Sequence, residues 1–329
     1  MKIAIDAMGG DYAPEATVNG ALLARKLWGI ESILVGDEAT IKPLLLDAKE
    51  EMEIVSAREA IGFDEHPLKA IRQKKDASIV VAAKLVDSGK ASALVAAGST
   101  GAAMAASLLT YGRLQGIDRP AIAFPLPTLK GMSLVLDGGA NPEAGWQNLV
   151  DFALLGSIYM EKVMGICKPK VALLNIGEEE IKGTPEVIEA YQKLKQSDLN
   201  FKGNIEARDI ISGNADVIVC SGFVGNIVLK YTEGLATGLF TMVKEAMLSN
   251  LKGKIGGLLV KDNLRVLKAR LDYSEYGGAP LLGLKNLTLI SHGSSDAKAV
   301  ANALRVAYTA SEKKIMEITK EALEKRAIT

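Results

Sequence analysis

Short apolar runs recur along the chain, and each ends in glycine or a small polar residue before a helical pattern begins. The runs lie at residues 2–5 (KIAI), 32–36 (SILVG), 92–98 (SALVAAG), 132–136 (MSLVL), 171–174 (VALL) and 216–220 (DVIVC). Strands that are apolar throughout and alternate with helices indicate a parallel sheet covered on both faces. The pattern therefore predicts a three-layer α/β/α fold with a mostly parallel sheet.

The chain-level organisation follows from the same pattern. We expect one two-lobed unit over residues 1–329, with the crossing between lobes near residues 128–131, after the proline-bearing FPLPT. Residues 295–326 begin with Ser and Asp and predict a long terminal helix that returns to the first lobe. Residues 235–248 and 255–271 predict two further amphipathic helices.

The glycine-rich turns all follow predicted strands. In open α/β sheets, ligands collect at the carboxyl ends of the strands, where loops lead into helix N-termini. The turns, although scattered along the sequence, are therefore expected to converge on one cleft.

Residues 91–112 (ASALVAAGSTGAAMAASLLTYG) form an uncharged stretch long enough to cross a bilayer. The stretch contains eight alanines and three glycines, and GSTG interrupts it near its middle. We therefore predict a buried strand, a turn and a packed helix in place of a membrane span.

Charge and cysteine content narrow the class of protein. Lys and Arg total 39 and Asp and Glu total 39, so no global field favours nucleic acid. Cys167 and Cys220 have no metal-type spacing, and Cys220 is expected to be a buried thiol at a strand end. The chain has no P-loop and no dinucleotide fingerprint, and we predict no cofactor and no metal.

Residues 97–102 (AGSTGA) have the composition of a phosphate site. Gly98 and Gly101 permit close approach of a ligand, Ser99 and Thr100 add hydroxyls, and a helix N-terminus follows. A tight strand-to-helix turn without a ligand would have the same glycines. A second turn of this type holds Gly222 and Gly225.

Two further segments offer chemical groups. Lys182, in NIGEEEIKG, is a cation suited to phosphate or to a developing oxyanion, although an ion-paired surface turn is an equal alternative. His66 lies beside acidic residues and ahead of Lys69, Arg72, Lys74 and Lys75, where it offers general acid or base capacity. His292, the other histidine, lies between a predicted strand and the terminal helix.

Residues 254–270 combine five basic side chains with leucine and valine. Such a helix suits an anionic membrane surface or an acidic partner. A helix pair that closes the core or forms a dimer interface remains an equal alternative.

Eight motifs in order resemble the PlsX family of bacterial phosphate acyltransferases. The motifs are DAMGGD-x-AP, EHPLKAIRQKKDAS, AGSTGA, LDGGAN, NIGEEEIKG, GNIEARDI, GFVGN and YGGAPLLG. The resemblance spans essentially the whole chain. A wider likeness, carried by AGSTGA and the overall layout, is to phosphotransacetylases and to the isocitrate and isopropylmalate dehydrogenase-like fold.

The resemblance implies an activity and its partners. It implies conversion of acyl-[acyl-carrier-protein] and inorganic phosphate into acyl phosphate and free carrier protein in phospholipid synthesis. It also implies a cytoplasmic homodimer, without a redox cofactor, that associates peripherally with the inner face of the membrane and passes product to a membrane glycerol-3-phosphate acyltransferase.

Combined with the residues above, this chemistry gives a set of expected roles. We expect Lys182 to stabilise phosphate or the oxyanion and His66 to act as acid or base. The amides of residues 98–101 and 222–225 would hold phosphate oxygens. Asn141, Asn175 and Asn226 would orient substrate.

One residue departs from the family pattern, and three rival functions stay open. The pattern has Asp after the cysteine where this chain has Ser221, which puts a role for that side chain in doubt. The alternatives are a coenzyme A-dependent phosphotransacetylase, a metal- and NAD-dependent dehydrogenase on the same fold, and a non-catalytic membrane-associated scaffold for lipid enzymes.

Overall fold

The computed structural model describes the backbone of residues 1–271 and 277–328, and the side chains of residues 1–267 and 277–325. Its first half contains β1 (Lys2–Asp6), α1 (Glu15–Trp28), β2 (Glu31–Gly36), α2 (Glu38–Ala48), β3 (Glu53–Ser56), α3 (Pro67–Gln73), α4 (Ser78–Asp87), β4 (Ala93–Ala96) and α5 (Thr100–Thr110). Next come β5 (Ala121–Thr128), β6 (Gly131–Leu136), α6 (Trp146–Lys162), β7 (Val171–Asn175), α7 (Pro185–Lys195), β8 (Phe201–Glu206), the 3-10 helix η1 (Ala207–Ser212) and β9 (Val217–Val219). The chain continues through α8 (Gly222–Leu248), α9 (Leu251–Leu271), β10 (Ala279–Leu282), β11 (Leu287–Ile290), α10 (Ala297–Glu312) and α11 (Ile315–Ile328).

Within the described residues, the strands form one sheet in the order β3-β2-β1-β4-β11-β10-β5-β6-β9-β7-β8. The outer strands pair in parallel on both sides, as the apolar runs predict. The three central pairings, β11–β10, β10–β5 and β5–β6, are antiparallel. Because three reversals separate them, the parallel strands of the two halves run in opposite directions.

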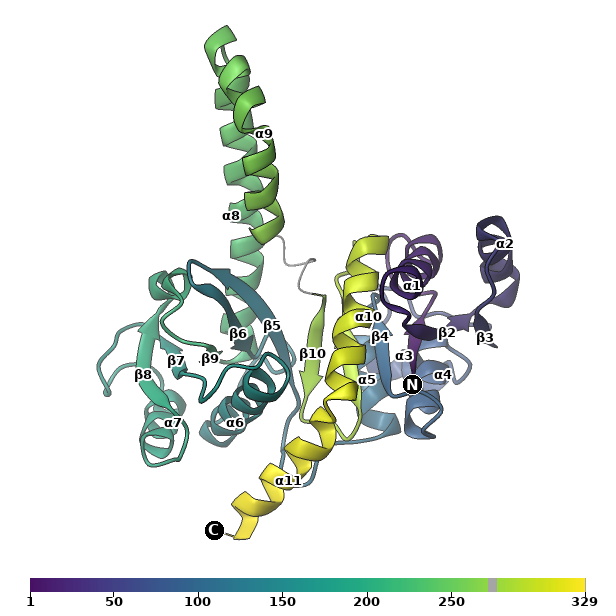
Figure 1. Ribbon diagram of the computed structural model, residues 1–329. Helices are drawn as coiled ribbons and strands as arrows, with labels where there is room; N and C mark the ends of the chain where they lie inside the picture. The colour runs from purple at the N-terminus through teal and green to yellow at the C-terminus, as the bar shows by residue number, and fades with distance from the viewer. Residues whose placement is uncertain (272–276, 329) are drawn as a thin grey trace.

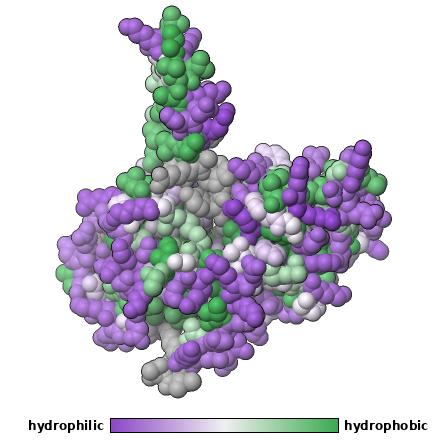
Figure 2. Space-filling view, viewed as in Figure 1, coloured by the Kyte–Doolittle hydropathy of each residue, from purple (hydrophilic) through white to green (hydrophobic). Residues whose placement is uncertain are grey.

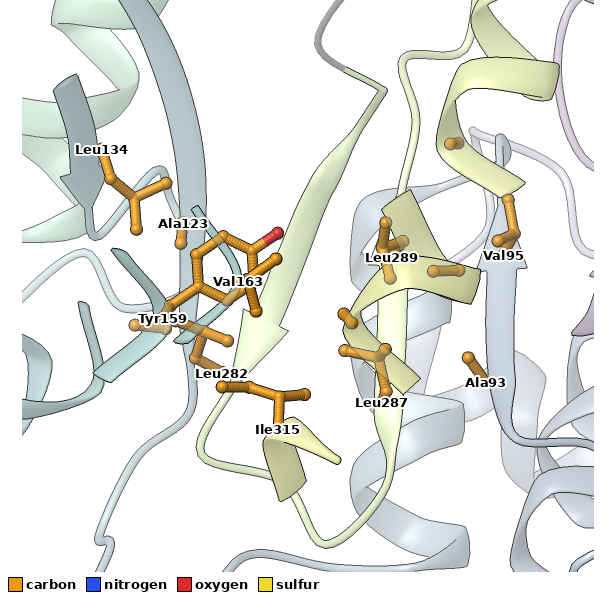
Figure 3. Packing of buried hydrophobic residues seen from close by; sticks show 14 of the residues in the cluster. Ala93, Val95, Ala123, Leu134, Tyr159, Val163, Leu282, Leu287, Leu289 and Ile315 are labelled. Carbon is orange, nitrogen blue, oxygen red and sulfur yellow. The ribbon is translucent and has the colours of Figure 1, made fainter. Parts of the chain in front are cut away.

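A continuous core holds the two halves together. One cluster of buried residues runs on one face of the sheet from Leu134 on β6, past Ala123 and Leu282, to Leu289 and Val95. Figure 3 shows members of this cluster on both sides of the central strands, with Ala123, Leu282 and Leu289 among them. The central antiparallel strands are therefore a packed seam.

The uncharged stretch folds as predicted. Residues 93–96 form the fully buried strand β4, and residues 100–110 form α5, which packs its alanines into the core. Across the part of the chain that the structure describes, the helices are too short or too polar to cross a membrane.

The terminal helix differs from the single helix expected over residues 295–326. It is divided into α10 and α11 at Lys313 and Lys314, and Lys314 adopts a left-handed φ of 52°. Helix α10 packs against α1, on the first half of the chain, whereas α11 contacts α6. Residues 128–131 form the turn of the β5–β6 hairpin, where Thr128 pairs with Gly131. The lobe boundary at that point stays a prediction.

Helices α8 and α9 form a hairpin that projects far from the body of the molecule (Figure 1). Helix α8 begins at Gly222, earlier than the expected start at residue 235, and only Ser249 and Asn250 separate it from α9. Along the hairpin, the exposed large apolar side chains include Tyr231, Leu239 and Leu258. Figure 2 shows these apolar surfaces on the projection.

Candidate active site at the central seam

A cavity of about 370 Å³ lies where the two halves of the sheet meet. Its walls are the first turn of α5, the middle of β5, the loop after β6, the first turns of α8 and the segment that joins β11 to α10. The segments that follow β4, β6, β9 and β11 contribute to it, and those after β4, β6 and β9 are three of the predicted glycine-rich turns. The volume falls within the range of small-molecule sites, about 300–1,000 Å³.

The first turn of α5 presents unpaired backbone donors to this cavity. Ser99 is the N-cap, and its side chain accepts a hydrogen bond from the Ala102 amide at 3.4 Å. The helical ladder starts with the Ala103 amide, which donates to the Ser99 carbonyl. The amides of Thr100 and Gly101 precede that first bond and line the cavity, which makes this end suited to an anion.

Gly101 also joins α5 to the segment that carries His66. A β-carbon at position 101 would lie 2.7 Å from Cγ of Pro67, so only glycine permits this contact. His66 is the exposed N-cap residue of α3, next to Pro67. His66 therefore lies near the first turn of α5, although its side chain is outside the lining of the cavity.

Behind the α5 turn lies Asp6, at the end of β1. Its side chain is 5% exposed and accepts hydrogen bonds from the Met8 amide and from Ser78. Burial raises the pKa of Asp6, and these hydrogen bonds oppose that rise. A β-carbon at Gly9 would lie 2.6 Å from its carboxylate and 3.0 Å from the Gly98 amide nitrogen. Asp6 and the two glycines thus fix the backbone beneath the AGSTGA turn.

Asp137, directly after β6, supports the cavity loop in the second half of the sheet as Asp6 supports the α5 turn in the first half. Its buried carboxylate accepts hydrogen bonds from the backbone amides of Ile122, Gly139, Ala140 and Asn141 at 2.6–3.2 Å. Burial raises the pKa of Asp137, and the same hydrogen bonds oppose that rise. The loop after β6, whose Gly138–Ala140 backbone lines the cavity, is therefore held by a single side chain.

The predicted amide cradle at Gly222 and Gly225 is corrected by the structure. The Gly222 amide donates to the Asn141 carbonyl, and the Gly225 amide donates to the Ser221 carbonyl. The amides between them are bonded to the Pro142 carbonyl and to the Ser221 hydroxyl. These donors are occupied within the chain, so the two glycines serve to pack α8 against residues 137–142.

Ser221, where the family pattern has aspartate, is the N-cap residue of α8. Its hydroxyl caps α8 by accepting from the Val224 amide at 3.4 Å. Aspartate is an equally good N-cap residue, so either side chain can begin this helix. Cys220, beside it, is 4% exposed, and burial followed by the nearby Asp137 charge raises its thiol pKa. The prediction of a buried strand-end thiol is confirmed.

The three asparagines lie in different surroundings. Asn226 lines the cavity, with its side chain next to Gly139. Asn141 is buried and donates to Asp137 and to the Pro120 carbonyl, so its amide group supports the loop. Asn175 donates to the Lys182 carbonyl at 2.9 Å and thereby closes the loop after β7.

Lys182 lies on that loop and outside the cavity lining. Its strand, β7, is separated from β6 by β9, so the loop is at some remove from the seam. Of the three glutamates before it, Glu180 is bonded to Lys195 at 2.7 Å. The side chain of Lys182 is exposed, and its role in the site stays a prediction.

The cavity also contains residues that were not among the expected site residues. Lys230 and Glu233 line the cavity from about the third turn of α8, with their charged groups 3.9 Å apart. His292 lines it from the segment before α10, and its Nδ1 accepts from the Ser294 amide at 3.2 Å. That acceptor role puts the proton of the neutral ring on Nε2. The helical spacing from Asn226 to Lys230 and Glu233 is the sequence signal that could have indicated the α8 residues.

The family of the chain follows from direct comparison. A family model described as "Fatty acid synthesis protein" matches residues 1–318. The chain belongs to this family. It is 57% identical over 311 residues to a phosphate acyltransferase of Heliobacterium modesticaldum, which covers 93% of each chain. It is 46% identical over 329 residues to a phosphate acyltransferase of Clostridioides difficile, which covers 99% of this chain and 97% of that one.

Family membership confirms the resemblance to PlsX and identifies the chain as an acyltransferase. Solved structures confirm the fold. The structure of a phosphotransacetylase from Streptococcus pyogenes has a TM-score of 0.64 at 18% identity and covers 95% of this chain and 94% of that one. EutD phosphotransacetylase from Staphylococcus aureus has a TM-score of 0.62 at 20% identity, with 94% of each chain covered.

Proposed function

We propose that this acyltransferase moves an acyl group from the thioester of acyl carrier protein to inorganic phosphate at the seam cavity. The observation that carries the proposal is the first turn of α5, where Thr100 and Gly101 line a largely apolar cavity and their amides precede the first helical hydrogen bond. A phosphate oxygen attacks the thioester carbonyl, the C–S bond breaks and an acyl–oxygen–phosphorus linkage forms. The thiolate leaves and takes up a proton.

The chain's residues supply positioning and charge compensation for this step. Phosphate is already ionised near neutral pH, so it needs donors and a fixed place more than a strong base. The α5 amides supply donors for a phosphate oxygen, and Asn226 lines the same cavity next to Gly139. Lys182, on the exposed loop after β7, compensates the charge of phosphate or of the tetrahedral oxyanion. His66, beside Pro67, supplies the proton to the departing thiolate.

The test is release of the carrier-protein thiol, measured with and without phosphate. Purified protein with acyl-[acyl-carrier-protein] should release free thiol only when phosphate is present, and hydroxylamine should trap one acyl phosphate for each thiol. Phosphate-independent release would identify a thioesterase and overturn the proposal. Greater activity with an acyl-coenzyme A donor would favour the phosphotransacetylase alternative.

The acidic carrier protein would meet a basic surface at the start of the first half. Lys69, Arg72 and Lys75 are exposed on and after α3, next to His66. Lys74 forms an ion pair with Glu65 at 2.7 Å, so the basic surface consists of the other three side chains, which are exposed. Charge reversal at Arg72 and Lys75 together should raise KM for the carrier-protein donor and leave KM for phosphate in place.

We propose that the α8–α9 hairpin provides the contacts with a second copy and with the inner face of the membrane. Leu258 and Leu259 are 73% and 80% exposed, beside Lys254 and Lys261. Apolar side chains flanked by lysines suit reversible attachment to an anionic surface. Lys268 and Arg270, part of the predicted basic face, have side chains outside the described residues. This arrangement supports a cytoplasmic, peripheral enzyme that passes acyl phosphate to a membrane glycerol-3-phosphate acyltransferase.

A further inference from the structure

The seam cavity changes character one helical turn beyond the phosphate-binding end. On α5, Thr100 and Gly101 lie in the first turn, and Met104 is the next residue of that helix to line the cavity. On α8, Asn226 is followed by Leu229, three residues further on, in the same lining. Residues three and four apart share one face of a helix, so the α5 wall passes from polar to apolar. On α8, Leu229 adds an apolar side chain between Asn226 and the charged pair Lys230 and Glu233, which also line the cavity.

The remaining wall continues the apolar surface. Ile122, Phe124 and Pro125 of β5 line the cavity, and Ile122 and Phe124 are 6% and 3% exposed. A β-carbon at Gly138 would lie 2.7 Å from Cδ1 of Phe124, so any larger residue at position 138 would displace the phenyl ring. The apolar part of the cavity is thus formed by rigid β5 side chains on one side and by helical side chains on the other.

Met104 and Leu229 belong to different packing units. Met104 is half-buried against the cluster that contains Leu94 and Ala103, whereas Leu229 is half-buried against the cluster that contains Val135 and Ile218. The apolar space therefore lies between two buried clusters, and Ala279, which also lines it, packs against both. A fully enclosed core would have filled this space with side chains, whereas here both residues keep part of their surface open to the cavity.

We propose that this apolar space holds the acyl chain of the substrate and that Met104 sets the chain length. The inference rests on the proposed function, because it places the reacting carbonyl at the Thr100–Gly101 end. From that end, an acyl chain would extend past Met104 and Leu229 along β5. Methionine is unbranched and adaptable, so its side chain narrows the space without closing it rigidly.

The test compares acyl-carrier-protein donors of short and long chain length on the unmodified protein and three variants. Met104→Trp fills the space and should lower the long-to-short ratio of kcat/KM by about tenfold or more. Met104→Ala enlarges the space and should raise the same ratio. Leu108→Ala is the matched control, because Leu108 is half-buried one turn further along α5 and outside the lining, and its ratio should match that of the unmodified protein.

The outcomes separate this inference from the proposed function. If the unmodified protein releases no thiol with phosphate and any donor, the proposed function fails and the inference fails with it. If the unmodified protein is active and the chain-length ratio is the same in Met104→Ala and Met104→Trp, the acyl-chain assignment alone is overturned. Met104→Ala keeps the test decisive if the tryptophan variant does not fold, because a residue without a role in chain length would leave the ratio unchanged.

Discussion

Gly225 of α8 lies against the backbone of Asp137, so closely that a β-carbon at position 225 would overlap the Asp137 carbonyl oxygen. Asp137 in turn holds the loop after β6 through four backbone amides. This contact, together with the bond from the Gly222 amide to the Asn141 carbonyl, positions the start of α8 against the cavity loop. The glycine pattern that suggested a phosphate cradle instead permits two segments to pack.

Replacing Gly225 by alanine should destabilise the protein on the order of 1–3 kcal/mol, because the added methyl overpacks a backbone contact. Gly234 is the matched control, since it lies on the same helix with nothing within 4 Å of a β-carbon. Gly234→Ala should raise stability by about 0.5–1 kcal/mol through helix propensity. Urea unfolding measures both changes, and equal effects at the two positions would contradict the packing account.

Lys182→Ala should lower kcat/KM in the phosphate-dependent thiol-release assay by about 10²–10³-fold, the scale of losing one oxyanion donor. Lys202→Ala is the control, since Lys202 is an exposed lysine on the neighbouring strand β8. The unfolding midpoints of both variants should match the unmodified protein. Near-normal activity of Lys182→Ala would remove this residue from the mechanism.

Tyr111 should make stability fall at high pH. Its hydroxyl is buried and bonded to Ser107 and Thr288, and burial raises its pKa from 10.0 to about 12. Between these values the unfolded chain loses the proton and the folded chain keeps it. The free energy of unfolding should therefore fall by about 1.4 kcal/mol per pH unit, starting at the unfolded pKa and levelling off above the folded one.

The control for this titration is Tyr111→Phe, which removes the ionisable group and its hydrogen bonds. Lysines and other tyrosines titrate in both proteins, so the difference between the two unfolding curves isolates Tyr111. That difference should shrink as the pH rises through the window. A constant difference would mean that the phenol titrates alike in the folded and unfolded chains.

Leu258→Glu combined with Leu259→Glu should abolish sedimentation with vesicles that contain anionic lipid, because both changes put charge on the exposed apolar part of α9. Leu109→Glu is the control, since Leu109 is 51% exposed on α5, in the body of the molecule. That variant should sediment like the unmodified protein. Unchanged sedimentation of the α9 variant would exclude this part of the hairpin as the membrane contact.

Local patterns predicted the outer strands and the AGSTGA turn well, because those features depend on neighbouring residues. The run at residues 92–98 became β4 with Ser99 as the cap of α5, as its composition indicated. The central seam could not be predicted in this way. β10 and β11 lie more than 100 residues after β4 and β5 in the chain but pair between them, and no local pattern records such pairing.

The site was predicted in part for the same reason. Thr100, Gly101 and Asn226 line the cavity because each follows a strand that ends at the seam. Lys182 and Asn175 also follow a strand, but β7 lies beyond β9, and strand order is a property of the whole sheet. His292 also follows a predicted strand, but it reaches the cavity because β11 inserts beside β4, and that strand order is not recorded in its sequence surroundings.

Helix α8 has its first turns in the wall of the cavity and its last turn at the tip of the hairpin, with no break between Gly222 and Leu248. From Leu229 to Leu248 it spans roughly 30 Å at the usual rise per residue. The helix is therefore a spacer of fixed length. Any surface that the tip contacts is therefore held at a fixed distance from the cavity. Inserting or deleting whole helical turns in both α8 and α9 would change that distance in steps of about 5 Å.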